Sequence, residues 1–391
     1  MEGDFIKIND WLLPLSWIYG AGVRLRNQMF EMGMLKSRSF DIPVISVGNI
    51  TVGGSGKTPH VEYLINLLRD KVKVAVLSRG YKRKSKGYML ATADTPMSDI
   101  GDEPYQMKKK FADIYVAVDK YRCHGIDQLT TNEETSDTDV ILLDDAYQHR
   151  YVKPGVNILL VDYHRLIMYD KLLPAGRLRE PQKGKARADI VIVSKCPADL
   201  KPMEFRVITK AMNLFPYQKL YFTTLKYGSL RPIYGGEDRK LDTLTGDTSI
   251  LLLTGIASPQ QMIVDLKPYT ERITPLTFPD HHQYTDADID RINAEFEAMK
   301  GNDKMIVTTE KDNARLCGME GLSDEVKKNI YVLPVEVGFM LDQEEDFNEN
   351  IIGYVRKNSR NSILAKAKDD NKSDNSDNSG NRTRTISFRN N

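Results

Sequence analysis

An alternation of short apolar, β-branched runs with helical patterns constrains this chain more than any other feature. The apolar runs lie at residues 43–47, 72–77, 114–118, 139–144, 157–162 and 189–194, and helical patterns such as the one at 60–70 separate several of them. Strands that alternate with helices generally pair in parallel, with the helices covering the faces of the sheet. The chain is therefore expected to be an α/β protein whose core is a parallel sheet.

Changes in the sequence pattern divide the chain into segments. Residues 219–236 alternate with period two and contain turn residues, which favours a β-hairpin. A second α/β pattern starts at 249, and the stretch 369–382 contains no apolar residue, which is typical of disorder. The expected segments are an N-terminal amphipathic helix (1–40), a core lobe (41–218), a hairpin linker (219–247), a smaller second α/β lobe (248–358) and a disordered polar tail (359–391).

The N-terminal segment contains both tryptophans of the chain, Trp11 and Trp17, followed by Arg24 and Arg26. Apolar residues recur in this segment at helical spacing. Aromatic side chains beside a basic polar face are typical of a helix that lies in a membrane interface. The plainer interpretation is a helix docked on the core, and the sequence favours the two equally.

Composition argues against several classes of protein. The chain has 55 Lys and Arg against 54 Asp and Glu, a net charge of +1, so no general attraction to nucleic acid is expected. No apolar run approaches the ~20 residues of a membrane-spanning helix, and no secretory signal is recognisable. Three cysteines without a CxxC pair argue against a disulfide framework and a structural zinc site. We expect a protein of the cytoplasmic side.

The strongest local motif is a strand, a glycine-rich loop and a helix between residues 43 and 68. The glycines allow backbone N–H groups to turn inward around a phosphate at the start of the helix. Lys57 can reach the outer phosphates, and the Thr58 hydroxyl can bind Mg²⁺. The strict phosphate-loop pattern wants glycine where this chain has Thr51, and a flexible loop without a ligand is the alternative. The expected nucleotide-binding residues are Thr51, Val52, Gly53, Gly54, Ser55, Gly56, Lys57 and Thr58.

Two acidic residues, Asp144 and Asp145, follow four apolar residues of a predicted strand. A phosphate loop needs carboxylates at the end of a neighbouring strand to organise its metal ion. A single aspartate at such a place could merely cap a turn, whereas a pair favours a metal site. We therefore expect Asp144 and Asp145, together with Thr58, to bind Mg²⁺.

Other candidate residues have two interpretations each. Asp102 with Glu103 before a proline indicates either the acidic first turn of a helix or functional carboxylates. Arg122 is either a phosphate clamp or a solvated surface arginine, and the sequence alone favours the surface. His281, beside Asp280, could assist acid–base chemistry or lie in a plain loop.

A basic cluster and an acidic junction complete the set of candidates. Residues 78–87 contain five basic side chains after a predicted strand, at the sheet edge where α/β folds bind ligands. An anionic substrate, a membrane surface or plain solvation would explain this basic cluster, which consists of Arg79, Lys82, Arg83, Lys84 and Lys86. Residues 308–312 lie at a strand-to-helix junction, where they have either a functional role or the role of a helix cap.

These motifs follow one another in an order that belongs to a known family. In sequence they read LLPLSWIYG, GNITVGGSGKTP, SRGY, GDEP, DDAYQH, LPAGRLREP, SKCP, FPDHHQY and TTEKD. Together they closely resemble the tetraacyldisaccharide 4′-kinase family of the lipid A pathway of Gram-negative bacteria, over roughly residues 8 to 355. The phosphate loop of that family also starts without the first consensus glycine.

The resemblance implies a P-loop NTPase-like core and a lipid kinase. Such enzymes transfer the γ-phosphate of ATP to the 4′-hydroxyl of a tetraacylated glucosamine disaccharide 1-phosphate, which gives lipid IVA. They work at the cytoplasmic face of the inner membrane, as peripheral proteins. Since a four-chain lipid does not diffuse freely in water, the tryptophan-rich N-terminal helix would supply the contact with the bilayer. The basic cluster would then meet the 1-phosphate of the lipid.

The same resemblance assigns roles to single residues. Asp102 corresponds to the base that takes the proton of the 4′-hydroxyl, and His281, paired with Asp280, supports it. The other assignments are to the phosphates and Mg²⁺ (Lys57, Thr58), to the metal side (Asp144, Asp145) and to positions near the phosphates (Arg122, His149).

Two other classes of protein remain as alternatives. A nucleotide-switch NTPase that acts with a protein partner would share the loop, but it would not explain the N-terminal segment or residues 278–284. A membrane-bound nucleotide-binding scaffold without catalysis would not explain Asp102 together with the aspartate pair. ATP hydrolysis that is independent of lipid would indicate the switch, and ATP binding without turnover would indicate the scaffold.

Overall fold

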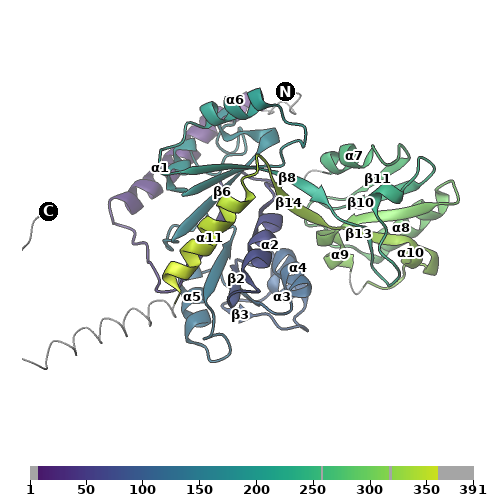
Figure 1. The fold of residues 1–391 in the computed structure, drawn as a ribbon, viewed down its shortest axis with the longest axis horizontal. Helices are drawn as coiled ribbons and strands as arrows, with labels where there is room; N and C mark the ends of the chain where they lie inside the picture. Colours follow the sequence, from purple (N-terminus) through teal and green to yellow (C-terminus); the bar gives the residue numbers. More distant parts are fainter. Residues whose placement is uncertain (1–7, 257–258, 317–318, 360–391) are drawn as a thin grey trace, which may run out of the picture.

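The structure is a computed structural model that describes residues 8–256, 259–316 and 319–359. It consists of two lobes, each built on its own sheet (Figure 1). The strands of the larger sheet are β1 (Val44–Asn49), β2 (Val74–Ser78), β3 (Met89–Leu90), β4 (Tyr115–Val118), β5 (Val140–Asp144), β6 (Val156–Asp162), β7 (Ile190–Ser194), β8 (Lys219–Tyr227) and β14 (Val335–Phe339).

The larger sheet has nine strands in the order β14–β8–β7–β6–β1–β5–β2–β4–β3. All pairs from β8 to β4 are parallel, and only the two edge strands, β14 and β3, run antiparallel to their neighbours. Every residue of β1, β2, β5 and β7 is buried, as expected for strands covered on both faces. The predicted α/β fold with a parallel core is therefore confirmed.

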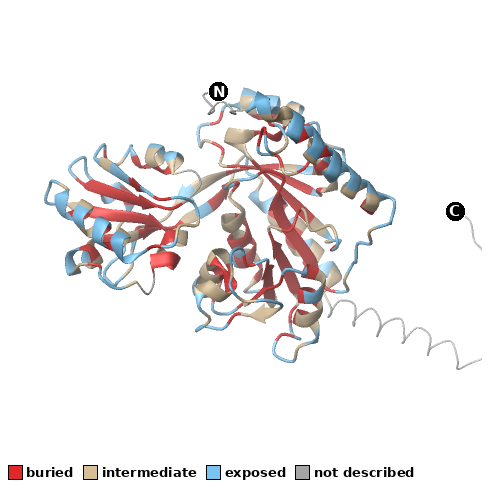
Figure 2. Cartoon of the chain, turned by 180° about the vertical axis from the view of Figure 1, so that it is seen from behind, coloured by how far each residue is buried: buried red, intermediate tan, exposed pale blue. Residues whose placement is uncertain are grey.

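Helices cover both faces of this sheet. The helices of the larger lobe are α1 (Leu13–Glu31), α2 (Lys57–Leu68), α3 (Met97–Ile100), α4 (Asp102–Lys110), α5 (Arg122–Thr131), α6 (Pro202–Met212) and α11 (Glu344–Asn358). Side chains of α2, α4 and α11 share one apolar cluster on one face. Those of α5 and α6 belong to clusters formed by the alternate strand residues, on the other face. Figure 2 shows the buried strands between these layers.

The smaller lobe repeats the plan with a five-stranded sheet in the order β11–β10–β12–β13–β9. Its strands are β9 (Arg231–Pro232), β10 (Ser249–Thr254), β11 (Ile273–Thr277), β12 (Lys304–Thr309) and β13 (Ile330–Leu333). Its helices are α7 (Gln260–Leu266), α8 (Asp286–Ala298), α9 (Glu310–Leu316) and α10 (Asp324–Asn329). Short 3₁₀ turns of the chain lie at Asp10–Leu12, Tyr163–Arg165, Ile167–Tyr169, Gln182–Arg187 and Leu241–Thr243.

The hairpin predicted for residues 219–236 is wrong. β8 pairs with β7 and β14 in the larger sheet, whereas β9 pairs with β13 in the smaller one. A single bridge between Leu230 and Arg239 is the local pairing in this stretch. Period-two alternation identifies a half-buried strand but does not identify its partner, and the partner of β8 is supplied by the returning chain at 335–339. The two lobes are therefore joined by β8 and β14 as an antiparallel pair.

The predicted end of the second lobe at residue 358 is also wrong. After β13 the chain returns to the larger lobe, where β14 extends the sheet and α11 packs against it. Phe347, Ile351 and Val355 of α11 are buried in the same apolar cluster as Ile45 of β1. An amphipathic pattern reveals that a helix has a buried face but does not reveal which sheet that face covers.

The N-terminal helix α1 is docked on one side and exposed on the other. Ser16 donates a hydrogen bond to the carbonyl of Leu172, and Tyr19 donates one to the carbonyl of Arg179. On the opposite side Trp17 is 72% exposed, and Trp11, in the 3₁₀ turn just before α1, is 93% exposed. No helix in the described part of the chain is long and apolar enough to cross a membrane. The predicted polar tail lies, from residue 360 onward, outside the described residues.

The placement of α11 is testable by substitution. Ile351→Ala removes a side chain that is 0% exposed, so we expect the free energy of unfolding to fall by about 2–5 kcal/mol. The control is Glu349→Ala, at an exposed position of the same helix, which should change it by less than about 0.5 kcal/mol. Urea denaturation measures both, and equal effects would contradict the packing of α11 on the core.

Candidate active site

The predicted phosphate loop lies between β1 and the first turn of α2. Gly53 has φ 120° and Gly56 has φ 77°, backbone conformations that residues with a Cβ rarely adopt. Two hydrogen bonds from the strand ends fix the loop at Ser55: Asn49 donates to the Ser55 hydroxyl at 2.7 Å, and Ser194 donates to the Ser55 carbonyl at 2.9 Å. Lys57 and Thr58 occupy the first turn of α2, at the positive end of the helix dipole. The arrangement suits a bound phosphate.

Asp144 and Asp145 lie beside this loop because β5 is the direct neighbour of β1, with Val47 opposite Asp144. Lys57 Nζ is 3.5 Å from Asp145 Oδ1, and Arg179 Nη1 is 3.3 Å from Asp145 Oδ2. Burial alone would raise the pKa of Asp145, but the charges of Lys57 and Arg179 lower it. The sequence therefore placed the aspartate pair correctly, but it did not single out Arg179.

Asp144 is in a different environment from its neighbour. It is buried, and Ser78 donates a hydrogen bond to its Oδ2 at 3.1 Å. Burial, together with the charges of Asp145 and Glu103, raises the pKa of Asp144 to about 6. A buried carboxylate with raised pKa gains most from a cation, so this site fits a metal ion better than it fits an empty turn.

The donor set is suitable for Mg²⁺. Within residues 8–256, 259–316 and 319–359, no three His, Cys, Asp or Glu side chains gather as a complete metal cage. Mg²⁺ usually keeps several waters and binds one or two carboxylates plus substrate phosphates. Asp144, Asp145 and the Thr58 hydroxyl could supply such a partial set beside the loop.

Arg122 is not the solvated surface arginine that the sequence alone favoured. It begins α5 and is 2% exposed, and it donates to the carbonyls of Asp119 at 3.0 Å and Asp144 at 3.3 Å. Burial lowers its pKa to about 10, so it remains charged at neutral pH. His149 lies nearby, and burial together with the charge of Arg122 lowers its pKa to about 4.

Asp102 links the two lobes. It is the first residue of α4, as the helix-start interpretation predicted, but its carboxylate also reaches into the second lobe. Asp102 Oδ2 is 3.1 Å from His281 Nδ1 and accepts hydrogen bonds from Arg315 Nη2 at 2.6 Å and Nε at 2.9 Å. Burial by itself would raise the pKa of Asp102, but the hydrogen bond with His281 and the charge of Arg315 lower it to about 2.

His281 and Asp280 lie on the loop between β11 and α8. His281 has φ 59°, and its ring lies 4.9 Å from that of Tyr81 in the larger lobe. The Asp280 carboxylate is 3.8 Å from His281 Nε2, so the histidine lies between Asp102 and Asp280. The predicted group of Asp102, His281 and Asp280 is thus brought together.

Two residues of this group were not predicted, Arg315 and Lys311 of α9. The Arg315 side chain is 1% exposed and also contacts Asp312 at 3.0 Å, and Lys311 Nζ is 2.9 Å from Glu103. The cap expected at 308–312 is present, because Thr309 and Asp312 exchange hydrogen bonds. That cap gave no signal for Arg315, which meets Asp102 only through the tertiary fold.

The basic cluster does not act as one surface. Arg83 is half-buried and donates to the carbonyls of Gly87 and Val118, which fixes the loop. The remaining members of the cluster are exposed: Arg79, Lys82, Lys84 and Lys86. The charge of Arg79 acts on Arg122 and His149, so this residue faces the phosphate side of the site.

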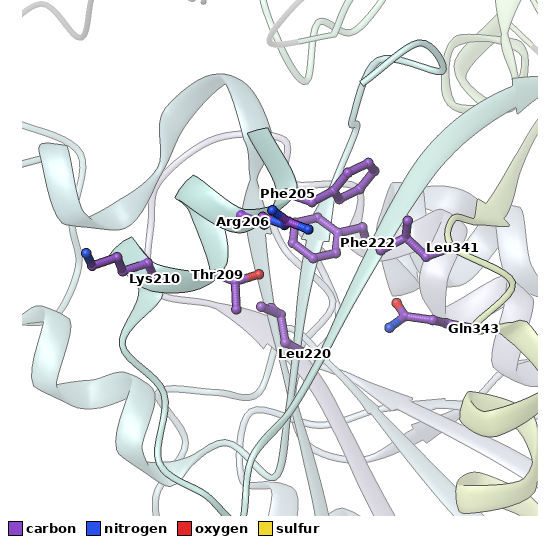
Figure 3. A pocket seen from close by; sticks show the side chains of 8 residues that line it. All are labelled: Phe205, Arg206, Thr209, Lys210, Leu220, Phe222, Leu341 and Gln343. Atoms are coloured by element: carbon purple, nitrogen blue, oxygen red, sulfur yellow. The ribbon is translucent and has the colours of Figure 1, made fainter. Parts of the chain in front are cut away.

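An open groove elsewhere on the larger lobe is separate from this site. It has a volume of about 440 Å³ and lies between α6 and the end of β14 (Figure 3). None of the predicted site residues lines it; the lining residues are Phe205, Arg206, Thr209, Lys210, Leu220, Phe222, Leu341 and Gln343.

Comparison with known proteins agrees with this geometry. Residues 8–356 match the family described as tetraacyldisaccharide-1-P 4′-kinase. The chain belongs to this family. It is 61% identical over 363 residues to the tetraacyldisaccharide 4′-kinase of Phocaeicola vulgatus, covering 93% of this chain and 99% of the relative. It is 54% identical to that of Bacteroides thetaiotaomicron, covering 93% and 98%.

A solved structure gives the same result for the fold. The "apo" form of LpxK from Aquifex aeolicus, described as a complex with ATP, superimposes with a TM-score of 0.67 at 31% identity. The match covers 88% of this chain and 98% of that one. The P-loop kinase fold expected from the sequence is thereby confirmed.

The low pKa of Asp102 predicts a pH-dependent contribution to stability. Because the folded-state pKa of about 2 lies below the ordinary value of 3.8, the stabilisation is present above pH 4 and is lost as the pH falls toward 2. Asp102→Asn should therefore lower the free energy of unfolding by about 2 kcal/mol at pH 7, and the difference from wild type should shrink below pH 4. Urea denaturation at each pH measures it.

The matched control is Asp94→Asn, at an exposed aspartate of the same lobe. It should differ little from wild type at any pH. A deficit of Asp102→Asn that stays constant down to pH 3 would contradict the ion pair with Arg315.

Proposed function

We propose that this protein transfers the γ-phosphate of ATP to the 4′-hydroxyl of tetraacyldisaccharide 1-phosphate, forming lipid IVA. The observation that carries the proposal is a phosphate loop beside an aspartate pair, with a third carboxylate, Asp102, at the junction of the lobes. Family membership supports the identity of the acceptor, because the relatives are named tetraacyldisaccharide 4′-kinase. The neighbouring structure is described as an ATP complex, which supports ATP as the donor.

The loop and its neighbours hold and neutralise the triphosphate. The backbone N–H groups of Gly53, Gly54 and Gly56 and the Lys57 ammonium bind phosphate oxygens, since phosphoryl transfer requires mainly alignment and charge neutralisation from the protein. Thr58, Asp144 and Asp145 would hold Mg²⁺, which would supply further charge neutralisation. The buried guanidinium of Arg122 adds a fixed positive charge on the side of Asp144.

Asp102 orients the acceptor and takes its proton. With a pKa of about 2 the carboxylate is ionised at neutral pH and is a weak base. A weak base is sufficient here, because bonding to the acceptor oxygen develops late in a loose transition state. His281 contacts the Asp102 carboxylate through Nδ1, and Asp280 lies on the Nε2 side of the same imidazole. Asp102 and Asp280 together therefore keep the imidazole of His281 oriented.

The substrate brings the protein to a lipid surface. α1 presents Trp17 and Ile18 outward while its other side is docked on the core, and Trp11 is exposed in the 3₁₀ turn just before it. Such a helix suits peripheral contact with the cytoplasmic face of the inner membrane, with the exposed lysines 82, 84 and 86 available to the 1-phosphate.

The deciding assay follows label from γ-labelled ATP. Purified protein is incubated with Mg²⁺ and tetraacyldisaccharide 1-phosphate in detergent micelles. Label should enter the lipid with wild type and fall at least about a hundredfold with Lys57→Ala and with Asp102→Ala. Lys71→Ala, an exposed lysine just after α2, is the control and should retain activity. Label released only as free phosphate, with or without lipid, would indicate a switch NTPase instead.

Membrane contact is tested separately with vesicles that contain anionic phospholipid. Replacing Trp11 and Trp17 together by alanine removes two exposed aromatic side chains, so binding should weaken about tenfold or more. Val264→Ser, at an exposed apolar position in the second lobe, should leave binding unchanged. Equal binding by wild type and the tryptophan variant in co-sedimentation would argue against α1 as the contact.

A further inference from the structure

The segment 170–180 runs along the outside of the phosphate loop. Val52 N donates to the Arg177 carbonyl at 2.8 Å, and Arg179 N donates to the Ile50 carbonyl at 2.7 Å. A bridge between Thr51 and Leu178 lies between these two hydrogen bonds. The backbone at Arg177 is therefore fixed relative to the glycines of the loop.

The same segment is held firmly from its other side. Asp170 is buried, and its carboxylate accepts hydrogen bonds from Arg177 N at 3.1 Å and from Arg165 Nε at 2.7 Å. Ser16 of α1 accepts a hydrogen bond from Ala175 N at 3.0 Å and donates one to the Leu172 carbonyl at 2.9 Å. Arg177 is thus presented from a rigid support that lies between α1 and the loop.

The Arg177 side chain is directed toward the loop and has no counter-ion. Its Nη1 lies 3.9 Å from the position that a Cβ on Gly53 would occupy. It is exposed and makes no ion pair or side-chain hydrogen bond with any residue that the structure describes, whereas two other cations near the loop are paired. Arg179 pairs with Asp145, and Lys195, on the other side of the loop, pairs with Asp162 at 3.2 Å.

We propose that Arg177 is a further phosphate-binding residue of this site. A planar guanidinium can bind two phosphate oxygens at once, and the guanidinium of Arg177 lies unpaired beside Gly53 of the phosphate loop. The phosphate belongs either to ATP or to the phosphorylated lipid, because the segment lies between the nucleotide loop and the lipid-facing helix. Binding of the lipid phosphate by Arg177 rests on the proposed function, whereas binding of an ATP phosphate does not.

The test compares Arg177→Gln with Lys171→Gln, which removes the same charge from an exposed position of the same segment. ATP binding is measured on the full chain without lipid, and KM is measured for ATP and for tetraacyldisaccharide 1-phosphate. We expect Arg177→Gln either to weaken ATP binding about tenfold or to raise the KM for the lipid about tenfold. Arg177→Lys should give an intermediate value. Lys171→Gln should stay within about twofold of wild type.

The outcomes separate the two sources and the two proposals. Weaker ATP binding without lipid assigns Arg177 to the nucleotide, and a raised KM for lipid alone assigns it to the lipid phosphate. If wild type binds ATP but never labels lipid, the proposed function fails while the ATP arm still decides on Arg177. Values for Arg177→Gln that match those of Lys171→Gln in both arms overturn the inference, as does a loss that Arg177→Lys does not restore in part.

Discussion

The parallel pairing of β1 with β5 is the constraint on which the site depends. Parallel neighbours end at the same edge of a sheet, so the loop after β1 and the aspartates after β5 meet without any further device. The flanking strands extend the same edge, because β2 ends at Ser78 and β7 at Ser194, and these serines hold Asp144 and the loop respectively. Four strand ends thus build one phosphate site.

The two aspartates at this edge are neighbours in the chain, but their carboxylates are in different electrostatic environments. Asp145 faces Lys57 and Arg179, which keep it ionised, while Asp144 is buried against a serine hydroxyl. The folded protein therefore holds one carboxylate whose charge is already compensated and one whose charge is destabilised by burial. A cation that arrived with a triphosphate would relieve that destabilisation, and metal and nucleotide binding would then be coupled.

Features whose residues lie close together in the chain could be predicted from the sequence, whereas contacts between residues far apart in the chain could not. The phosphate loop and the aspartate pair are local patterns, because each is formed by residues that are consecutive in the chain, and their placement follows from the parallel sheet. The ion pair of Asp102 with Arg315 joins residues from different lobes, and the pairing of β8 with β14 spans the whole second lobe. No periodicity marks such partners, so the predicted hairpin was wrong and Arg315 was not found.

The side chains around Asp102 and Glu103 come from both lobes. Asp102 is bound by Arg315 and His281 of the second lobe, while its neighbour Glu103 is bound by Lys311 of α9. The surroundings of Asp102 are therefore built from both lobes, whereas the phosphate loop and the aspartate pair belong to the larger lobe. Since β8 and β14 are the strands that join the lobes, the geometry at Asp102 depends on that antiparallel pair.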